Sequence, residues 1–149
     1  MNTVDTVTIL NRLIVTSKNG ESALRSAADE AWHEELKQSL SEYSQFFGQA
    51  ARELQEEVRK MGGHPRGLGT FGNTLHRTWM HVRAKAMGQD EGVILDEVEQ
   101  DESEADYMYA DAIRNWDTPP DVHALLERQA AEARRRHDAI HELRARLMS

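Results

Sequence analysis

The sequence contains no cysteine and no long apolar run. Without cysteine the chain cannot form disulfides, thiolate nucleophiles or sulfur-ligated zinc sites, so any protein ligands to a metal must be carboxylates or histidines. No segment approaches the roughly 18 apolar residues of a membrane span, and the N-terminus has no basic leader followed by an apolar core. We therefore expect a cytoplasmic protein of bacterial type that has no membrane partner.

Net basic charge is also missing. The formal net charge is -8, and most of the 18 lysines and arginines have acidic neighbours in the sequence. A nucleic-acid partner needs a basic face for phosphate contacts, so we do not expect one. A chain of 149 residues can bury about 70% of its unfolded surface around one core, and we therefore predict a single domain over residues 1–149.

The sequence shows no strict alternation of apolar and polar residues that would favour a strand, and apolar residues recur with a period of 3.6. The fold class predicted is therefore all-α. The periodicity predicts long helices over residues 3–32 and 34–61, a third from behind Asp90 to near Trp116, and a fourth from Thr118 onward. A shorter helix is expected at about 71–87.

Local signals set several of these boundaries. Gly62-Gly63 is typical of a helix C-terminus, and Thr118 followed by two prolines is typical of a helix start. Asn19-Gly20 is a turn signal inside the first helix, which leaves a kink or break there as the alternative to a continuous helix.

One carboxylate interrupts the apolar stripe of the third long helix. The stripe consists of Leu95, Val98, Glu102, Ala105, Tyr109 and Ala112. A carboxylate that faces a core is costly unless it is protonated, paired or bound to a metal. Arg136 and Gln129 on the fourth helix are the expected partners, and a metal ion is the alternative.

Charge is distributed unevenly between the last two helices. Residues 90–111 contain ten acids and no lysine or arginine, whereas the fourth helix carries six arginines. We interpret Arg134, Arg135 and Arg136 as partners of these acids, with a phosphate or anion site as the alternative. Two acid-x-x-His pairs, Glu30 with His33 and Asp138 with His141, have spacing compatible with a peripheral divalent cation, although solvated helix ends are the simpler interpretation.

Several segments together resemble a known family. They are Glu53-Leu54-Gln55, Met61-Gly62-Gly63, Leu75-His76-Arg77-Thr78-Trp79, Ile94-Leu95-Asp96-Glu97, Glu102 with Tyr109, Leu125-Leu126-Glu127-Arg128-Gln129, and His137-Asp138. With them the chain resembles an uncharacterised bacterial four-helix-bundle family of the ferritin-like superfamily. The resemblance implies a ferritin-like bundle in which a long crossover, containing the short extra helix, joins helices two and three and makes them parallel.

The superfamily's chemistry is carried by two iron or manganese ions, held by one Glu from each of two helices and a Glu-x-x-His from each of the others. The residues that could take part here are Glu21, Glu102, Glu132 and His137. The second helix lacks histidine, and its centre reads Gln45-Phe46-Phe47-Gly48-Gln49, which departs from the pattern.

Two functions follow as expectations. The first is a non-catalytic structural or interaction module, stress-related in role, with no catalytic residues. The alternative is a carboxylate-bridged metal-binding bundle with redox or storage activity. The apolar side of the short helix, which includes Leu75, Trp79 and Val82, is expected to cover the bundle or to build a homodimer.

Overall fold

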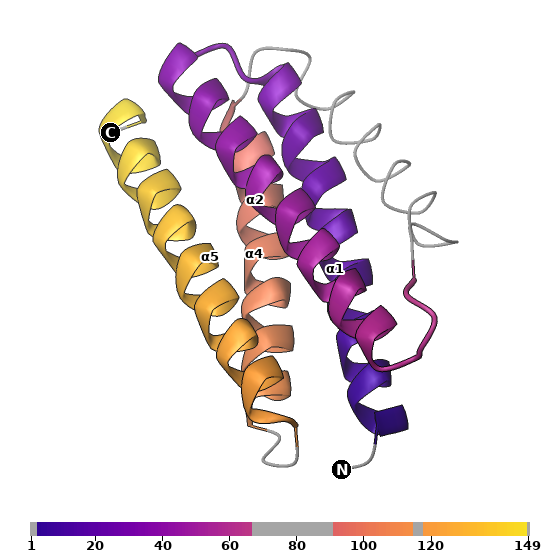
Figure 1. Cartoon of the computed structure of the whole chain (residues 1–149). Helices are drawn as coiled ribbons and strands as arrows, with labels where there is room; N and C mark the ends of the chain where they lie inside the picture. Colours follow the sequence, from indigo (N-terminus) through magenta and orange to yellow (C-terminus); the bar gives the residue numbers. More distant parts are fainter. Residues whose placement is uncertain (1–2, 67–90, 115–117, 149) are drawn as a thin grey trace.

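The computed structural model describes residues 3–66, 91–114 and 118–148, and all four elements within them are helices. They are α1 (Thr3–Glu30), α2 (Glu34–Lys60), α4 (Glu91–Ile113) and α5 (Pro120–Leu147). Figure 1 shows them side by side as a four-helix bundle. The prediction of an all-α four-helix bundle is confirmed, whereas the short helix expected at about 71–87 lies outside the described residues.

Glycines explain two features of the first helix pair. α1 continues through Asn19 and Gly20, as predicted. Glycine suits position 20 because the Phe47 ring packs closely against it: a Cβ there would lie 3.0 Å from Cδ2. α2 ends at Lys60, and Gly62, which belongs to the predicted C-terminal glycine pair, has a left-handed φ of 76°. The Gly62 and Gly63 amides donate to the carbonyls of Arg59 and Val58, the two hydrogen bonds of a Schellman motif.

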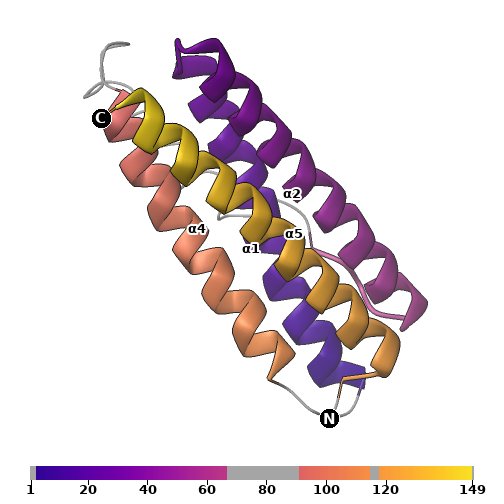
Figure 2. The same ribbon diagram turned by 90° about the vertical axis from the view of Figure 1, so that its left-hand side faces the viewer.

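Each helix packs against two others: α1 against α2 and α4, and α5 against α2 and α4. Contacts between helix ends fix the directions. The Glu91 carboxylate at the start of α4 accepts hydrogen bonds from the backbone at Trp32 and His33, immediately before α2. Arg146 near the end of α5 binds Glu35 of α2. Neighbouring helices are therefore antiparallel, and α2 and α4 run in the same direction (Figure 2).

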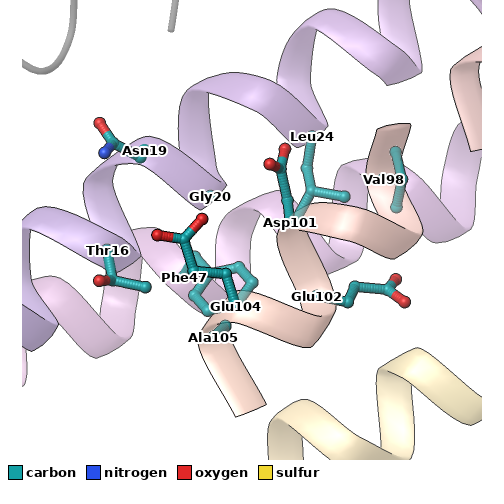
Figure 3. Close-up of a pocket in the computed structure, with 10 residues that line it drawn as sticks. All are labelled: Thr16, Asn19, Gly20, Leu24, Phe47, Val98, Asp101, Glu102, Glu104 and Ala105. Carbon is teal, nitrogen blue, oxygen red and sulfur yellow. The ribbon is translucent and has the colours of Figure 1, made fainter. Parts of the chain in front are cut away.

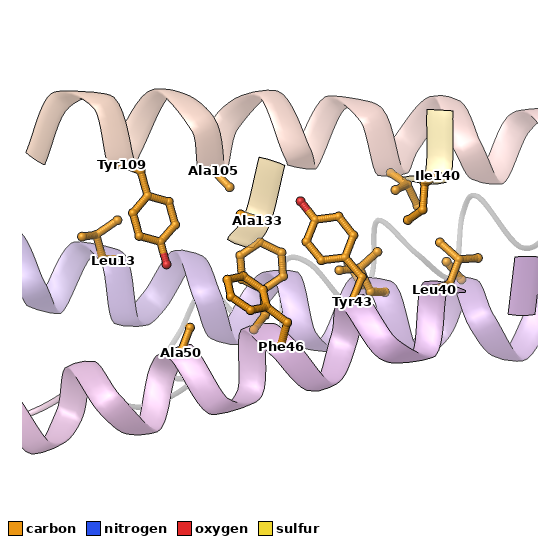
Figure 4. Packing of buried hydrophobic residues seen from close by; sticks show 14 of the residues in the cluster. Leu13, Leu40, Tyr43, Phe46, Ala50, Ala105, Tyr109, Ala133 and Ile140 are labelled. Atoms are coloured by element: carbon orange, nitrogen blue, oxygen red, sulfur yellow. The ribbon is translucent and has the colours of Figure 1, made fainter. Parts of the chain in front are cut away.

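The core draws on all four described helices, and Figure 4 shows part of its packing. Aromatic rings from α2 fill its middle. Tyr43 and Phe47 stack with their centroids 5.0 Å apart, and Phe46 lies 5.2 Å from Phe47. Tyr109 of α4 is 2% exposed. No described helix is long and apolar enough to cross a membrane.

Four predicted boundaries differ slightly from the structure. α1 ends at Glu30, two residues before the predicted end at 32, and α2 ends at Lys60, one residue before the predicted end at 61. α4 ends at Ile113, three residues before the predicted end near Trp116. At the start of α5 the N-cap position is occupied by Pro119, one residue after the predicted cap Thr118, and Pro120 is the first helical residue. Proline suits this position because its missing N–H would have no partner inside the helix.

Candidate functional site

Glu102 lies in the bundle interior, as its place in the apolar stripe predicts. The residue is 2% exposed, and neither carboxylate oxygen accepts a hydrogen bond from the part of the chain that the structure describes. Its side chain leaves α4 toward α5, away from Asp101 and Glu104 (Figure 3). Its nearest charged or chargeable partner is His137, whose Nε2 lies 3.1 Å from Oε2 without hydrogen-bond geometry.

The surroundings of Glu102 disfavour its negative charge. Burial is the main cause that raises the pKa of this carboxyl, to about 8, and the neighbouring acids Glu99 and Asp106 raise it further. Burial first, then the carboxylates of Glu102 and Asp106, raise the pKa of the Tyr43 hydroxyl on α2. The raised pKa favours the protonated carboxyl at neutral pH, whereas a cation bound beside Glu102 would favour the carboxylate.

Acids on α4 face histidines and an arginine on α5, and we call this row the α4–α5 seam. Its acids are Asp96, Glu99, Glu102 and Asp106, and its partners on α5 are His137, His141 and Arg144. Asp106 lies 3.7 Å from the Nδ1 of His137, and Glu99 lies 3.5 Å from the Nε2 of His141. Because α4 and α5 are antiparallel, residues later in α4 face residues earlier in α5. Asp96 faces Arg144, whereas Asp106 faces His137.

A small cavity of about 70 Å³ lies between α1 and α4, above the ring of Phe47 (Figure 3). Asn19 and Asp101 each bring to its wall a buried oxygen without a hydrogen bond among the described residues. Burial first, then the charges of Glu97 and Glu104, raise the pKa of Asp101 to about 7. The cavity exceeds the roughly 10–15 Å³ that one water needs, so water can satisfy these two oxygens.

Gln129 and Arg136, the predicted partners of Glu102, contact other groups. Gln129 accepts a hydrogen bond from the Tyr109 hydroxyl at 2.8 Å and donates to Glu53 at 3.1 Å. The Arg136 guanidinium lies over the Phe46 ring, 4.7 Å from its centroid, and donates to a backbone carbonyl. The interior therefore contains two separate polar layers, and His137 takes the place beside Glu102.

Of the four predicted metal ligands, the structure brings together Glu102 and His137. Glu21 lies 3.6 Å from Lys18 and 3.2 Å from Arg25 on its own helix. Glu132 lies 3.5 Å from Arg128. Within the described ranges no three His, Asp or Glu side chains converge in a way that could hold a metal ion. A common metal site for all four stays a prediction.

The periodicity did not single out Glu91, which the structure places at a structural joint. This carboxylate is 3% exposed and accepts hydrogen bonds from the amides of Trp32 and His33 at 2.7 and 3.0 Å, and its other oxygen contacts His33 Nδ1. Burial alone would raise the pKa of Glu91, but these bonds outweigh it and hold the pKa below its usual value. The only sequence signal for Glu91 was its position in the first turn of a helix. That position does not distinguish a buried joint from a solvated helix start, because an acid is favourable in both.

The comparison with known families covers three of the four described helices. Residues 5–115 match the family described as a domain of unknown function, DUF2383. The chain belongs to the DUF2383 family. The matched region contains α1, α2 and α4 with Glu102, whereas α5, which supplies His137, follows it. No curated protein matches the chain. DUF2383 membership assigns no activity.

Proposed function

We propose that this DUF2383 protein is a single-domain, ferritin-like bundle that acts as a non-catalytic structural or interaction module in the cytoplasm. The parallel directions of α2 and α4 support the ferritin-like assignment, because that superfamily connects its second and third long helices by a crossover along the bundle. The connection itself lies in residues 67–90, outside the described chain.

The filling of the bundle centre is the observation that carries the proposal. A two-metal carboxylate centre needs metal ligands from all four helices at one level. At the level of Glu102, α2 contributes the packed rings of Tyr43, Phe46 and Phe47. Further along the bundle, the Gln129 side chain accepts a hydrogen bond from Tyr109 and donates one to Glu53. On α2 these side chains occupy positions where a two-metal centre would need ligands, while Glu102 on α4 keeps both carboxylate oxygens without a hydrogen bond among the described residues.

The module would act as a homodimer. Among the described residues, two large aromatic side chains remain outside the core, Trp32 with 57% and Tyr107 with 64% exposure, and aromatic residues are enriched at protein interfaces. Sedimentation velocity on the full chain tests the oligomeric state, with Trp32→Ser and Tyr107→Ser as variants. A dimer that one of these substitutions weakens supports the proposal, whereas a monomer at every concentration refutes the dimer.

A metal-binding bundle with storage or redox activity, using iron or manganese, is the second candidate. The observation in its favour is the buried Glu102 carboxylate, which has no hydrogen bond and lies beside an imidazole. Metal analysis of protein purified from iron- and manganese-supplemented cells separates the two candidates. Two ions per chain, lost in Glu102→Gln, would establish this second function and overturn the first.

A further inference from the structure

Two carboxylate-imidazole pairs lie one helical turn apart in the α4–α5 seam. The first is Glu102 with His137 and the second is Glu99 with His141. The two imidazole rings pack against each other with centroids 4.8 Å apart. We propose that this seam binds one divalent transition-metal ion such as Zn²⁺, with Glu102 and His137 as the first ligands and Glu99 and His141 completing the shell.

The distance between Glu102 and His137 fits two ligands of one ion. Zinc binds carboxylate oxygen and imidazole nitrogen at about 2.0–2.2 Å, which places two ligand atoms of a single ion roughly 3.0–3.5 Å apart. Glu102 Oε2 and His137 Nε2 are 3.1 Å apart and are not hydrogen-bonded to each other. A cation between them would satisfy an oxygen that is otherwise buried without a partner.

The second pair completes the site after a small rearrangement. Glu99 and Glu102 are three residues apart and therefore lie on one face of α4. His137 and His141 are four residues apart and lie on one face of α5. In the present side-chain positions no three described groups converge. The His141 side chain is 54% exposed, so its ring can turn toward His137 without disturbing the core. Glu99 would exchange its contact with Arg144, now at 3.1 Å, for the metal.

The outer contacts also suit a metal ligand. Metal-bound histidines commonly donate their second ring nitrogen to a carboxylate, which orients the ring and strengthens the ligand. Asp106 Oδ2 lies 3.7 Å from His137 Nδ1, the nitrogen that would face away from the ion. The site is mixed oxygen and nitrogen without sulfur, which zinc, nickel and cobalt all accept.

A second histidine-acid pair on α5 provides a matched control. His123 lies 3.4 Å from Glu127, and its Nε2 is engaged with the Ile113 carbonyl at 3.1 Å. The pair is one turn apart on a single helix, and Glu127 is exposed. Replacing His123 therefore shows how much Zn²⁺ binding an ordinary surface pair of histidine and acid contributes.

The experiment is isothermal titration of Zn²⁺ into the chelator-treated full chain at pH 7, with Co²⁺ absorption as an independent readout of coordination. We expect one Zn²⁺ per chain and visible Co²⁺ bands of a four-coordinate site. Glu102→Gln and His141→Ala should each weaken Zn²⁺ binding at least about tenfold. His123→Ala should leave the affinity unchanged. Circular dichroism and urea unfolding of each variant verify that it is folded.

Three outcomes would overturn the proposal: no stoichiometric Zn²⁺ binding, equal affinity in Glu102→Gln, or equal losses in His123→Ala and His141→Ala, which would indicate adventitious surface binding only. Loss of binding in Glu102→Gln but not in His141→Ala also contradicts the four-ligand site. The proposed module is tested separately, because a single non-redox ion in the seam is compatible with it and its absence leaves it intact.

Discussion

Replacing Glu102 by Gln removes the buried acid while keeping its shape, and the result should depend strongly on pH. The native carboxyl keeps its proton up to about pH 8, whereas in the unfolded chain it releases the proton near the ordinary value of 4.5. Between these values the native state binds more protons than the unfolded state, so the stability of the wild-type protein falls as the pH rises. Glutamine cannot ionise and lacks this dependence.

The size of the effect follows from the pKa difference. Each unit between the folded and unfolded pKa corresponds to about 1.4 kcal/mol. The rise from 4.5 to about 8 therefore costs the wild-type protein on the order of 4–5 kcal/mol across that interval. Near pH 5 the variant should have nearly the wild-type free energy of unfolding, and near pH 8 it should be several kcal/mol more stable than wild type.

Urea unfolding monitored by circular dichroism, from pH 5 to 9 and with a chelator present, measures this difference. Glu142→Gln on α5 is the control, because Glu142 is exposed and its replacement should shift stability by less than about 0.5 kcal/mol at any pH. The reasoning is refuted if Glu102→Gln loses stability relative to wild type as the pH rises, since Glu102 would then be an ionised partner of His137.

Three further substitutions test other parts of the structure by chemical unfolding. Glu91→Gln should lower the free energy of unfolding by about 2–3 kcal/mol at pH 7, because it weakens the bonds to the Trp32 and His33 amides. This loss should shrink as the pH falls through the lowered native pKa of Glu91, since the wild-type carboxylate then also loses its charge. A loss that grows in acid would contradict the assigned bonds. Phe47→Ala should cost roughly 3–5 kcal/mol because it empties the middle of the core, and a change below 1 kcal/mol would mean that the ring is not packed there. Tyr109→Phe should cost about 1–2 kcal/mol by leaving the Gln129 carbonyl oxygen without its donor, whereas an unchanged stability would show that Gln129 finds another partner.

The sequence predicted the helices well because burial repeats within each helix. The stripe of α4 is buried at all six predicted positions, and α1 is continuous through Asn19 and Gly20. Glu102 was recognised as an interior acid for the same reason. The periodicity of apolar residues can be read from the sequence of one helix alone, without knowing which helices pack against it.

Contacts between helices were harder to predict. The sequence predicted Arg136 as a partner of Glu102, but His137 is adjacent to Arg136 in sequence and lies about 100° from it around the helix. Packing decides between them: Arg136 reaches Phe46, and His137 meets Glu102. Glu91 was missed because its partners, Trp32 and His33, are almost 60 residues away in sequence.

Oxidation of ferrous iron tests the central claim most directly. Anaerobic chelator-treated protein is mixed with two equivalents of Fe²⁺ per chain and then exposed to oxygen, while oxygen consumption and the absorbance of ferric species are recorded. A packed, non-catalytic bundle predicts oxidation no faster than in buffer and at most one bound ion per chain. Binding of two Fe²⁺ per chain with rapid oxidation that Glu102→Gln abolishes would contradict it.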